Sequence, residues 1–211
     1  MSKIKAVIFD MDGVLIDAKD WHYEALNRAL NHFGYKISRY DHLVTFDGLP
    51  TRKKLEMLSR EQGLPPMLHK FLNELKQLYT IEIVHTQCKP VFQHEYALSN
   101  LRAAGYKLAV ASNSVRNSVE LMMEKSKLRR YLDVLFSNED VKNGKPDPEI
   151  YIKVMASLGV HPEESLVVED NEHGIAAAKM AGANLMIVES VMDVTLDSVL
   201  RHIQNIEVNS C

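Results

Sequence analysis

The segment "VIFDMDGVLID", residues 7–17, decides the fold of this chain. Apolar residues typical of a buried β-strand run directly into Asp10, Met11, Asp12 and Gly13. In open α/β sheets, ligands bind beyond the carboxyl ends of such strands. A glycine lets the backbone turn sharply away, so that both carboxylates can point to one place. The segment therefore predicts the first strand of a parallel sheet, with a polar site at its end.

Length and composition limit the class of protein. The 211 residues suffice for an α/β domain with an insertion, and a formal charge of −3 gives no basic surface of the kind that nucleic-acid binding needs. No apolar run approaches the roughly 18 residues of a membrane span, and no signal peptide is recognisable. Cys88 and Cys211 are too few for a disulfide framework. We expect a cytoplasmic protein without nucleic-acid or membrane partners; its oligomeric state stays open, with a monomer slightly favoured.

Five short apolar segments have the composition of strands that are buried on both faces of a parallel sheet. They are residues 4–9, 107–112, 133–137, 165–169 and 184–188. Amphipathic helical patterns lie between them, and glycines stand where those helices should end. This alternation predicts a doubly wound α/β fold.

Residues 17–90 interrupt the alternation. They contain helical patterns but no convincing buried strand, and Pro65-Pro66 separates two of the helices. We therefore expect a helical insertion over residues 17–90 and a core domain formed by residues 1–16 and 91–211.

Polar residues follow each of the first four predicted strands. They are Asp10 and Asp12, then Ser112 and Asn113, then Lys145, and finally Glu169 and Asp170. Taken singly, each has an ordinary structural explanation as a turn residue, a helix cap or a solvated lysine. Because the carboxyl ends of parallel strands share one edge of the sheet, their joint occurrence predicts a functional site there.

These side chains are suited to phosphoryl transfer. A carboxylate can attack a phosphoryl group and form an aspartyl-phosphate, which splits hydrolysis into two easier steps. Because neighbouring carboxylates repel, a hard divalent cation such as Mg²⁺ has to neutralise them, and Asp170 and Glu169 would supply further ligands. Lys145 would offset charge on the nucleophile and the phosphate, while Ser112 would bond phosphate oxygens. Asp12 would protonate the leaving oxygen and later activate water.

The motifs "IFDMDGVLID", "SNS", "KPDPEIY" and "VVEDNEHGIAAAKMAGA" together resemble the four motifs of the haloacid dehalogenase superfamily, in particular its β-phosphoglucomutase-like phosphatases. The resemblance covers essentially the whole chain. It implies a Rossmann-like core with an inserted α-helical cap. It also implies a set of roles: Asp10 as nucleophile, Asp12 as acid and base, Mg²⁺ at Asp10, the Asp12 carbonyl and Asp170 with Glu169 close by, and phosphate contacts from Ser112, Asn113 and Lys145.

Two activities fit this resemblance. Our first choice is a Mg²⁺-dependent phosphatase that acts on a small phosphomonoester, expected to be a sugar phosphate. The alternative is a phosphosugar mutase, because His22, Gly48 and Arg52 match substrate-side positions of β-phosphoglucomutase. Against the mutase, the lysine expected in the cap falls at Leu75, and Lys76 is one residue out of register.

A third possibility is a catalytically weak regulatory or binding domain that keeps the fold. The intact set of Asp10, Asp12, Lys145 and Asp170 argues against it.

Overall fold

The structure is a computed structural model that describes residues 4–46 and 48–209. The chain divides into two compact units. One is Ala18–Cys88, and the other is formed by the described residues before and after it. The insertion expected over residues 17–90 overlaps the first unit, which begins at Ala18 and ends at Cys88. Cys211 lies outside the described residues.

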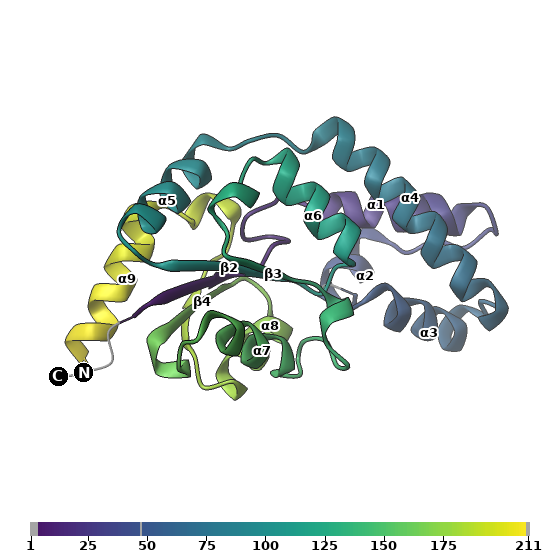
Figure 1. Cartoon of the computed structure of the whole chain (residues 1–211). Helices are drawn as coiled ribbons and strands as arrows, with labels where there is room; N and C mark the ends of the chain where they lie inside the picture. The colour runs from purple at the N-terminus through teal and green to yellow at the C-terminus, as the bar shows by residue number, and fades with distance from the viewer. Residues whose placement is uncertain (1–3, 47, 210–211) are drawn as a thin grey trace. The chain divides into compact units, whose positions relative to one another are not determined.

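A five-stranded parallel sheet lies at the centre of the larger unit, as predicted (Figure 1). Its strands are β1 (Ala6–Phe9), β2 (Lys107–Ala111), β3 (Val134–Phe136), β4 (Ser165–Glu169) and β5 (Asn184–Ile187). The spatial order is β3-β2-β1-β4-β5, so that Val7 lies between Leu108 of β2 and Leu166 of β4. The chain first builds outward from β1 through β2 to β3 and then returns to its other side, which places a topological switch point between β1 and β4.

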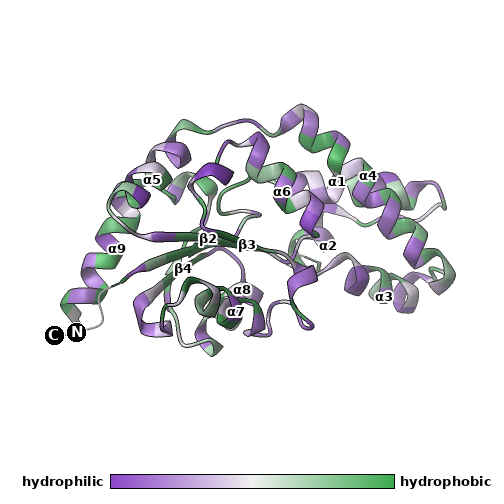
Figure 2. Ribbon diagram, in the orientation of Figure 1, coloured by the Kyte–Doolittle hydropathy of each residue, from purple (hydrophilic) through white to green (hydrophobic). Residues whose placement is uncertain are grey.

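Helices cover both faces of this sheet. They are α5 (Phe92–Ala103), α6 (Arg116–Lys125), α7 (Glu149–Leu158), α8 (Glu172–Met180) and α9 (Leu196–Asn209). Figure 1 shows α7 and α8 below the sheet and α5 and α6 above it. All four residues of β1 are fully buried, which explains why this strand is apolar throughout instead of alternating. In Figure 2 the strands are accordingly mostly green, whereas the helices alternate between green and purple.

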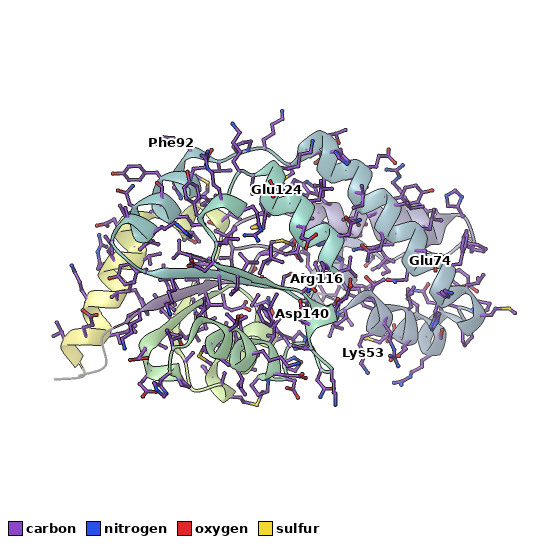
Figure 3. All side chains as sticks on the ribbon, viewed as in Figure 1. Lys53, Glu74, Phe92, Arg116, Glu124 and Asp140 are labelled. Atoms are coloured by element: carbon purple, nitrogen blue, oxygen red, sulfur yellow. The ribbon has the colours of Figure 1, made fainter. Side chains whose placement is uncertain are left out.

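The loops of the larger unit contain short 3₁₀ turns, which are Arg129–Tyr131, Asn138–Asp140, Pro162–Glu164 and Val191–Asp193. One of them anchors the segment after β3. Asp140 accepts hydrogen bonds from the backbone N–H and the hydroxyl of Ser137, at 2.8 and 2.9 Å, and forms an ion pair with Arg116 (Figure 3). This loop leads directly to Lys145.

The smaller unit contains helices joined by loops and has no strand among its described residues. It contains α1 (Lys19–Asn31), α2 (Arg39–Val44), α3 (Thr51–Gln62), a 3₁₀ turn (Pro66–Leu68) and α4 (His69–Gln87). Leucines from three of these helices form its core, among them Leu30, Leu58 and Leu72. The unit therefore has an apolar interior of its own. Among the described residues of the whole chain, no helix is both long enough and apolar enough to cross a membrane.

Candidate active site

Asp10 and Asp12 lie at the carboxyl end of β1. The backbone N–H of Asp10 still donates to Val168 of β4 at 2.9 Å, so the strand fixes its position, and its side chain is buried. The chain then folds back on itself: Gly13 has a φ of 92° and donates to the carbonyl of Ile16 at 2.7 Å. A residue with a Cβ rarely adopts this backbone conformation. The glycine therefore permits the turn that was predicted from the sequence.

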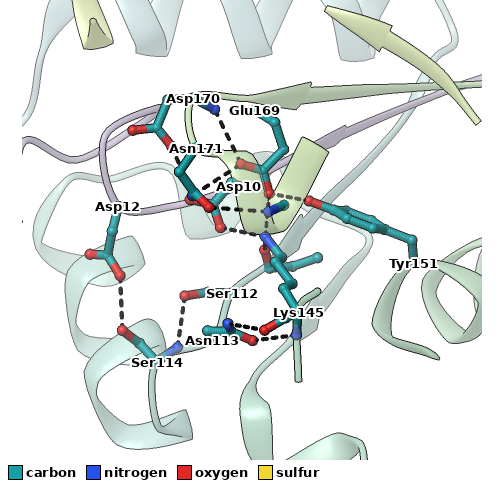
Figure 4. Close-up of polar contacts among 12 residues, drawn as sticks. Asp10, Asp12, Ser112, Asn113, Ser114, Lys145, Tyr151, Glu169, Asp170 and Asn171 are labelled. Atoms are coloured by element: carbon teal, nitrogen blue, oxygen red, sulfur yellow. Dashed lines mark hydrogen bonds and ion pairs between the residues drawn. The ribbon is translucent and has the colours of Figure 1, made fainter. Parts of the chain in front are cut away.

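Lys145 lies in the middle of a buried cluster (Figure 4). Its ammonium group donates to Asp10 Oδ1 at 2.6 Å, to Glu169 Oε1 at 2.6 Å and to the carbonyl of Ala111 at 2.9 Å. An ammonium has three N–H donors, and here each has an acceptor. Lys145 therefore holds two carboxylates from two different strands in a fixed relation to each other.

Asn113 supports the loop that carries this lysine. Its side-chain amide donates to the carbonyl of Lys145 at 3.1 Å and accepts from the N–H of Lys145 at 2.9 Å. Gly144 makes this contact possible, because a Cβ there would lie 2.6 Å from Asn113 Oδ1. The amide side chain of Asn113 is thus bonded to the lysine loop, and a phosphate contact from this residue stays a prediction.

A serine that the sequence reasoning did not assign to the site orients Asp12. Ser114 donates its hydroxyl to Asp12 Oδ2 at 2.8 Å, and its own N–H donates to the hydroxyl of Ser112 at 3.0 Å (Figure 4). Ser112 is buried at the end of β2, where it was expected. The "SNS" segment thus connects the end of β2 to the lysine loop through Asn113 and to Asp12 through Ser114.

The carboxylate of Glu169 is held by four groups of the chain. Its Oε1 accepts from Lys145 and, at 2.5 Å, from the hydroxyl of Tyr151. Its Oε2 accepts from the N–H of Asp170 at 3.1 Å and from the side-chain amide of Asn171 at 3.3 Å. In the sequence, Tyr151 and Asn171 look like an apolar helix residue and a helix cap, so only the fold reveals their contacts with Glu169.

The geometry fits a metal ion. Asp10, Glu169 and Asp170 each offer a carboxylate oxygen, and these oxygens lie within 4.8 Å of one another. Such an all-oxygen set is the kind that Mg²⁺ prefers.

The charges of the site also favour a metal ion. Lys145 forms ion pairs with Asp10 and Glu169, and the carboxylates of Asp12 and Asp170 lie close enough to act on Asp10 electrostatically. Burial raises the pKa of Asp10 well above its usual range; Lys145 opposes the rise, and the neighbouring carboxylates add to it. Burial alone would lower the pKa of Lys145, but Asp10 and Glu169 outweigh it and raise that pKa. Several carboxylates therefore gather at one place, and a divalent cation would offset their mutual repulsion.

The remaining predicted residues belong to the smaller unit. His22 on α1 lies with its Nδ1 3.1 Å from the ammonium of Lys76 on α4. Gly48 lies in the loop before α3 with a φ of 67°. The side chain of Arg52 is 86% exposed and donates to Glu56 at 2.9 Å. Leu75 packs against the core of the unit. Lys76 and not Leu75 thus lies beside His22, and the mutase stays an alternative.

Comparisons with known proteins show the family of the chain. A family model described as haloacid dehalogenase-like hydrolase matches residues 7–188. The chain is 33% identical over 200 residues to a phosphorylated carbohydrates phosphatase of Thermotoga maritima, covering 90% of this chain and 88% of that one. It is 29% identical to the pyrophosphatase PpaX of Anoxybacillus flavithermus, covering 85% and 80%. Among solved structures, β-phosphoglucomutase from Clostridium difficile superimposes with a TM-score of 0.84 at 20% identity, covering 97% and 99%, a likeness that shows the fold alone.

Proposed function

The chain belongs to the haloacid dehalogenase-like hydrolases and is a phosphoric monoester hydrolase of that family, and we propose that it hydrolyses a small sugar phosphate with Mg²⁺ as its cofactor. One observation carries the proposal: buried Asp10 is held by Lys145, and Asp12, two residues further on, is held separately by Ser114. The name of the Thermotoga maritima relative supports a phosphorylated carbohydrate as the substrate class. We also expect the protein to act in the cytoplasm.

The reaction has two steps. A carboxylate oxygen of Asp10 attacks the phosphorus, and the bond to the leaving sugar oxygen breaks as that oxygen takes a proton from Asp12. Asp12 is then a base that removes a proton from water, and the oxygen of this water attacks the phosphorus of the aspartyl-phosphate. Inorganic phosphate leaves, and Asp10 regains its carboxylate. The charge of Lys145 favours both steps, since negative charge develops on the phosphoryl oxygens.

Mg²⁺ would be held by the carboxylates of Asp10 and Asp170 and by the backbone carbonyl of Asp12, with Glu169 beside them. When bound, it neutralises the carboxylates and polarises a phosphoryl oxygen. The burial of Asp10 and the close approach of the carboxylates of Asp10, Glu169 and Asp170 support this assignment.

Phosphosugar mutase activity remains the second candidate, and the pair formed by His22 and Lys76 favours it. A mutase must bind a bisphosphate, and therefore needs a cation for the phosphate that does not react. Lys76 is such a cation, and Arg52 is a further one.

A single assay separates the two activities. β-Glucose 1-phosphate is supplied with Mg²⁺ and a trace of glucose 1,6-bisphosphate, beside a panel of other sugar phosphates and pyrophosphate. We expect inorganic phosphate to accumulate from a member of the panel, and no glucose 6-phosphate to form at a competitive rate. Rapid formation of glucose 6-phosphate without phosphate release would instead establish the mutase.

A further inference from the structure

Tyr151 is a buried tyrosine for which the two-step reaction has no role. It lies in α7 with none of its surface exposed, in the apolar cluster between α7, α8 and the sheet. A phenylalanine would fill the same volume. The hydroxyl, however, lies 2.5 Å from Glu169 Oε1 and points at the carboxylate, as Figure 4 shows. The hydroxyl therefore needs an explanation beyond packing.

Tyr151 contacts both charged partners at the centre of the site. Its hydroxyl and the ammonium of Lys145 donate to the same oxygen of Glu169. The ammonium also lies 4.9 Å from the centre of the tyrosine ring, within the range of a cation–π contact. Two donors that converge on one oxygen fix its position more firmly than Lys145 alone could, and Lys145 transmits that position to Asp10.

The packing around Gly174 also fixes the position of Glu169. A Cβ at Gly174 would lie 1.8 Å from Glu169 Oε1 and 2.0 Å from its Cδ, far inside van der Waals contact. The start of α8 thus leaves just enough room for the Glu169 carboxylate in its present position. Glu169 is therefore fixed by a hydrogen bond on one side and by close packing on another.

From these contacts we infer that Tyr151 is a positioning residue: its hydroxyl orients Glu169, and through Lys145 also Asp10, for metal binding and attack. The inference rests on the proposed function. Partners that orient the groups around a metal ion typically change metal affinity or activity by about 10- to 100-fold when they are lost. Losing the hydroxyl should disorder both carboxylates while leaving substrate contacts elsewhere intact.

The test compares the full-length wild type with Tyr151→Phe, which removes the hydroxyl alone. Mg²⁺ affinity is measured by calorimetry, and kcat and KM with p-nitrophenyl phosphate at saturating Mg²⁺. We expect Mg²⁺ to bind Tyr151→Phe about tenfold more weakly, and kcat to fall about tenfold with KM within about twofold of the wild type. Tyr35→Phe is the matched control, because it removes a hydroxyl that donates to the carbonyl of Gly63 in the smaller unit, and it should change neither quantity.

Tyr151→Phe with Mg²⁺ affinity and kcat both within about twofold of the wild type would overturn the inference. If that variant does not fold, Gly174→Ala tests the same contact, since its methyl group must displace Glu169. Wild-type Mg²⁺ affinity and turnover in Gly174→Ala would overturn it equally. A wild type that binds Mg²⁺ but releases no phosphate would refute the proposed function. Because calorimetry needs no turnover, the Mg²⁺ affinities of the wild type and of Tyr151→Phe would still decide the role of Tyr151.

Discussion

At the residue scale, the site depends on a few buried charges that compensate one another. Lys145 touches the carboxylates of Asp10 and Glu169 at 2.6 Å, and removing a partner from such a buried set leaves an uncompensated charge. The positions of Asp10 and Glu169 at the strand ends could be predicted from the sequence, because a strand that is apolar throughout and then ends in a carboxylate is a local pattern. The roles of the Ser114 and Tyr151 hydroxyls could not be predicted, because serine is just as common in helix caps as in functional sites, and tyrosine is just as common in cores.

The hydrogen bond from Ser114 to Asp12 gives a first prediction. Ser114→Ala should lower kcat about tenfold, since Asp12 then loses the donor that orients it for proton transfer, and Ser114→Thr should restore most of the loss. Steady-state kinetics with p-nitrophenyl phosphate measure both variants. Wild-type kcat in Ser114→Ala would show that the bond has no part in proton transfer.

The raised pKa of Asp10 gives a second prediction. A carboxylate whose pKa is raised takes up a proton at a higher pH than usual, and a protonated carboxyl binds a cation poorly. Protons and Mg²⁺ therefore compete, so the Mg²⁺ dissociation constant should increase as the pH falls. Calorimetric titrations at a series of pH values provide the measurement. An affinity independent of pH would mean that Asp10 is not a ligand.

At the scale of elements, the loop between β3 and α7 carries Lys145, and Glu149 in the first turn of α7 holds this loop in place. Glu149 accepts from the N–H groups of Lys142 and Asn143 at 3.0 Å each, and pairs with Lys153 at 2.7 Å. The bond from Lys153, followed by those two N–H groups, lowers the pKa of Glu149 to about 2. The alternation of strands and helices was predictable because each element has its own pattern of apolar residues. The contacts by which Glu149 holds this loop follow no periodic pattern in the sequence, so they could not be predicted.

The variant Glu149→Gln tests whether Glu149 holds this loop in place. Because the pKa of Glu149 is lowered in the folded protein, its ionised form stabilises the fold above pH 4.5, and this contribution is lost as the pH falls toward about 2. The variant should therefore unfold at a lower temperature than the wild type at pH 7, with a difference that shrinks below pH 4.5. Calorimetric melts at several pH values measure it. A difference that stays constant down to pH 3 would contradict the assignment.

At the scale of the whole molecule, the larger unit carries the groups that we propose to react, and the smaller unit carries the predicted residues His22, Gly48 and Arg52. The pairing of His22 with Lys76 illustrates what the sequence leaves undetermined. The two residues are 54 positions apart on different helices, and the phase of one helix against another is set by core packing, here with Leu75 turned toward that core. The neighbours of Lys76 therefore could not be predicted from the spacing of a motif, while the fold itself was predicted correctly.

We expect the smaller unit to select the substrate. Lys76→Ala should raise KM about fivefold or more for the sugar phosphate identified by the panel, while KM for p-nitrophenyl phosphate stays within about twofold, because only the sugar phosphate offers hydroxyl groups away from the reacting phosphate. Lys70→Ala on the same helix, an exposed lysine 4.0 Å from Glu74, is the control and should change neither value. Equal effects of Lys76→Ala on both substrates would argue against selection by this residue.

The most direct test of the central claim is phosphate release by Asp10→Asn. The amide keeps the shape of the carboxylate but cannot attack phosphorus, so turnover of a sugar phosphate with saturating Mg²⁺ should fall by roughly 10³-fold or more while the unfolding transition stays cooperative. Wild-type enzyme treated with EDTA should likewise lose its activity and regain it with Mg²⁺. An Asp10→Asn variant that retains phosphate release within about tenfold of the wild type would show that Asp10 is not the nucleophile.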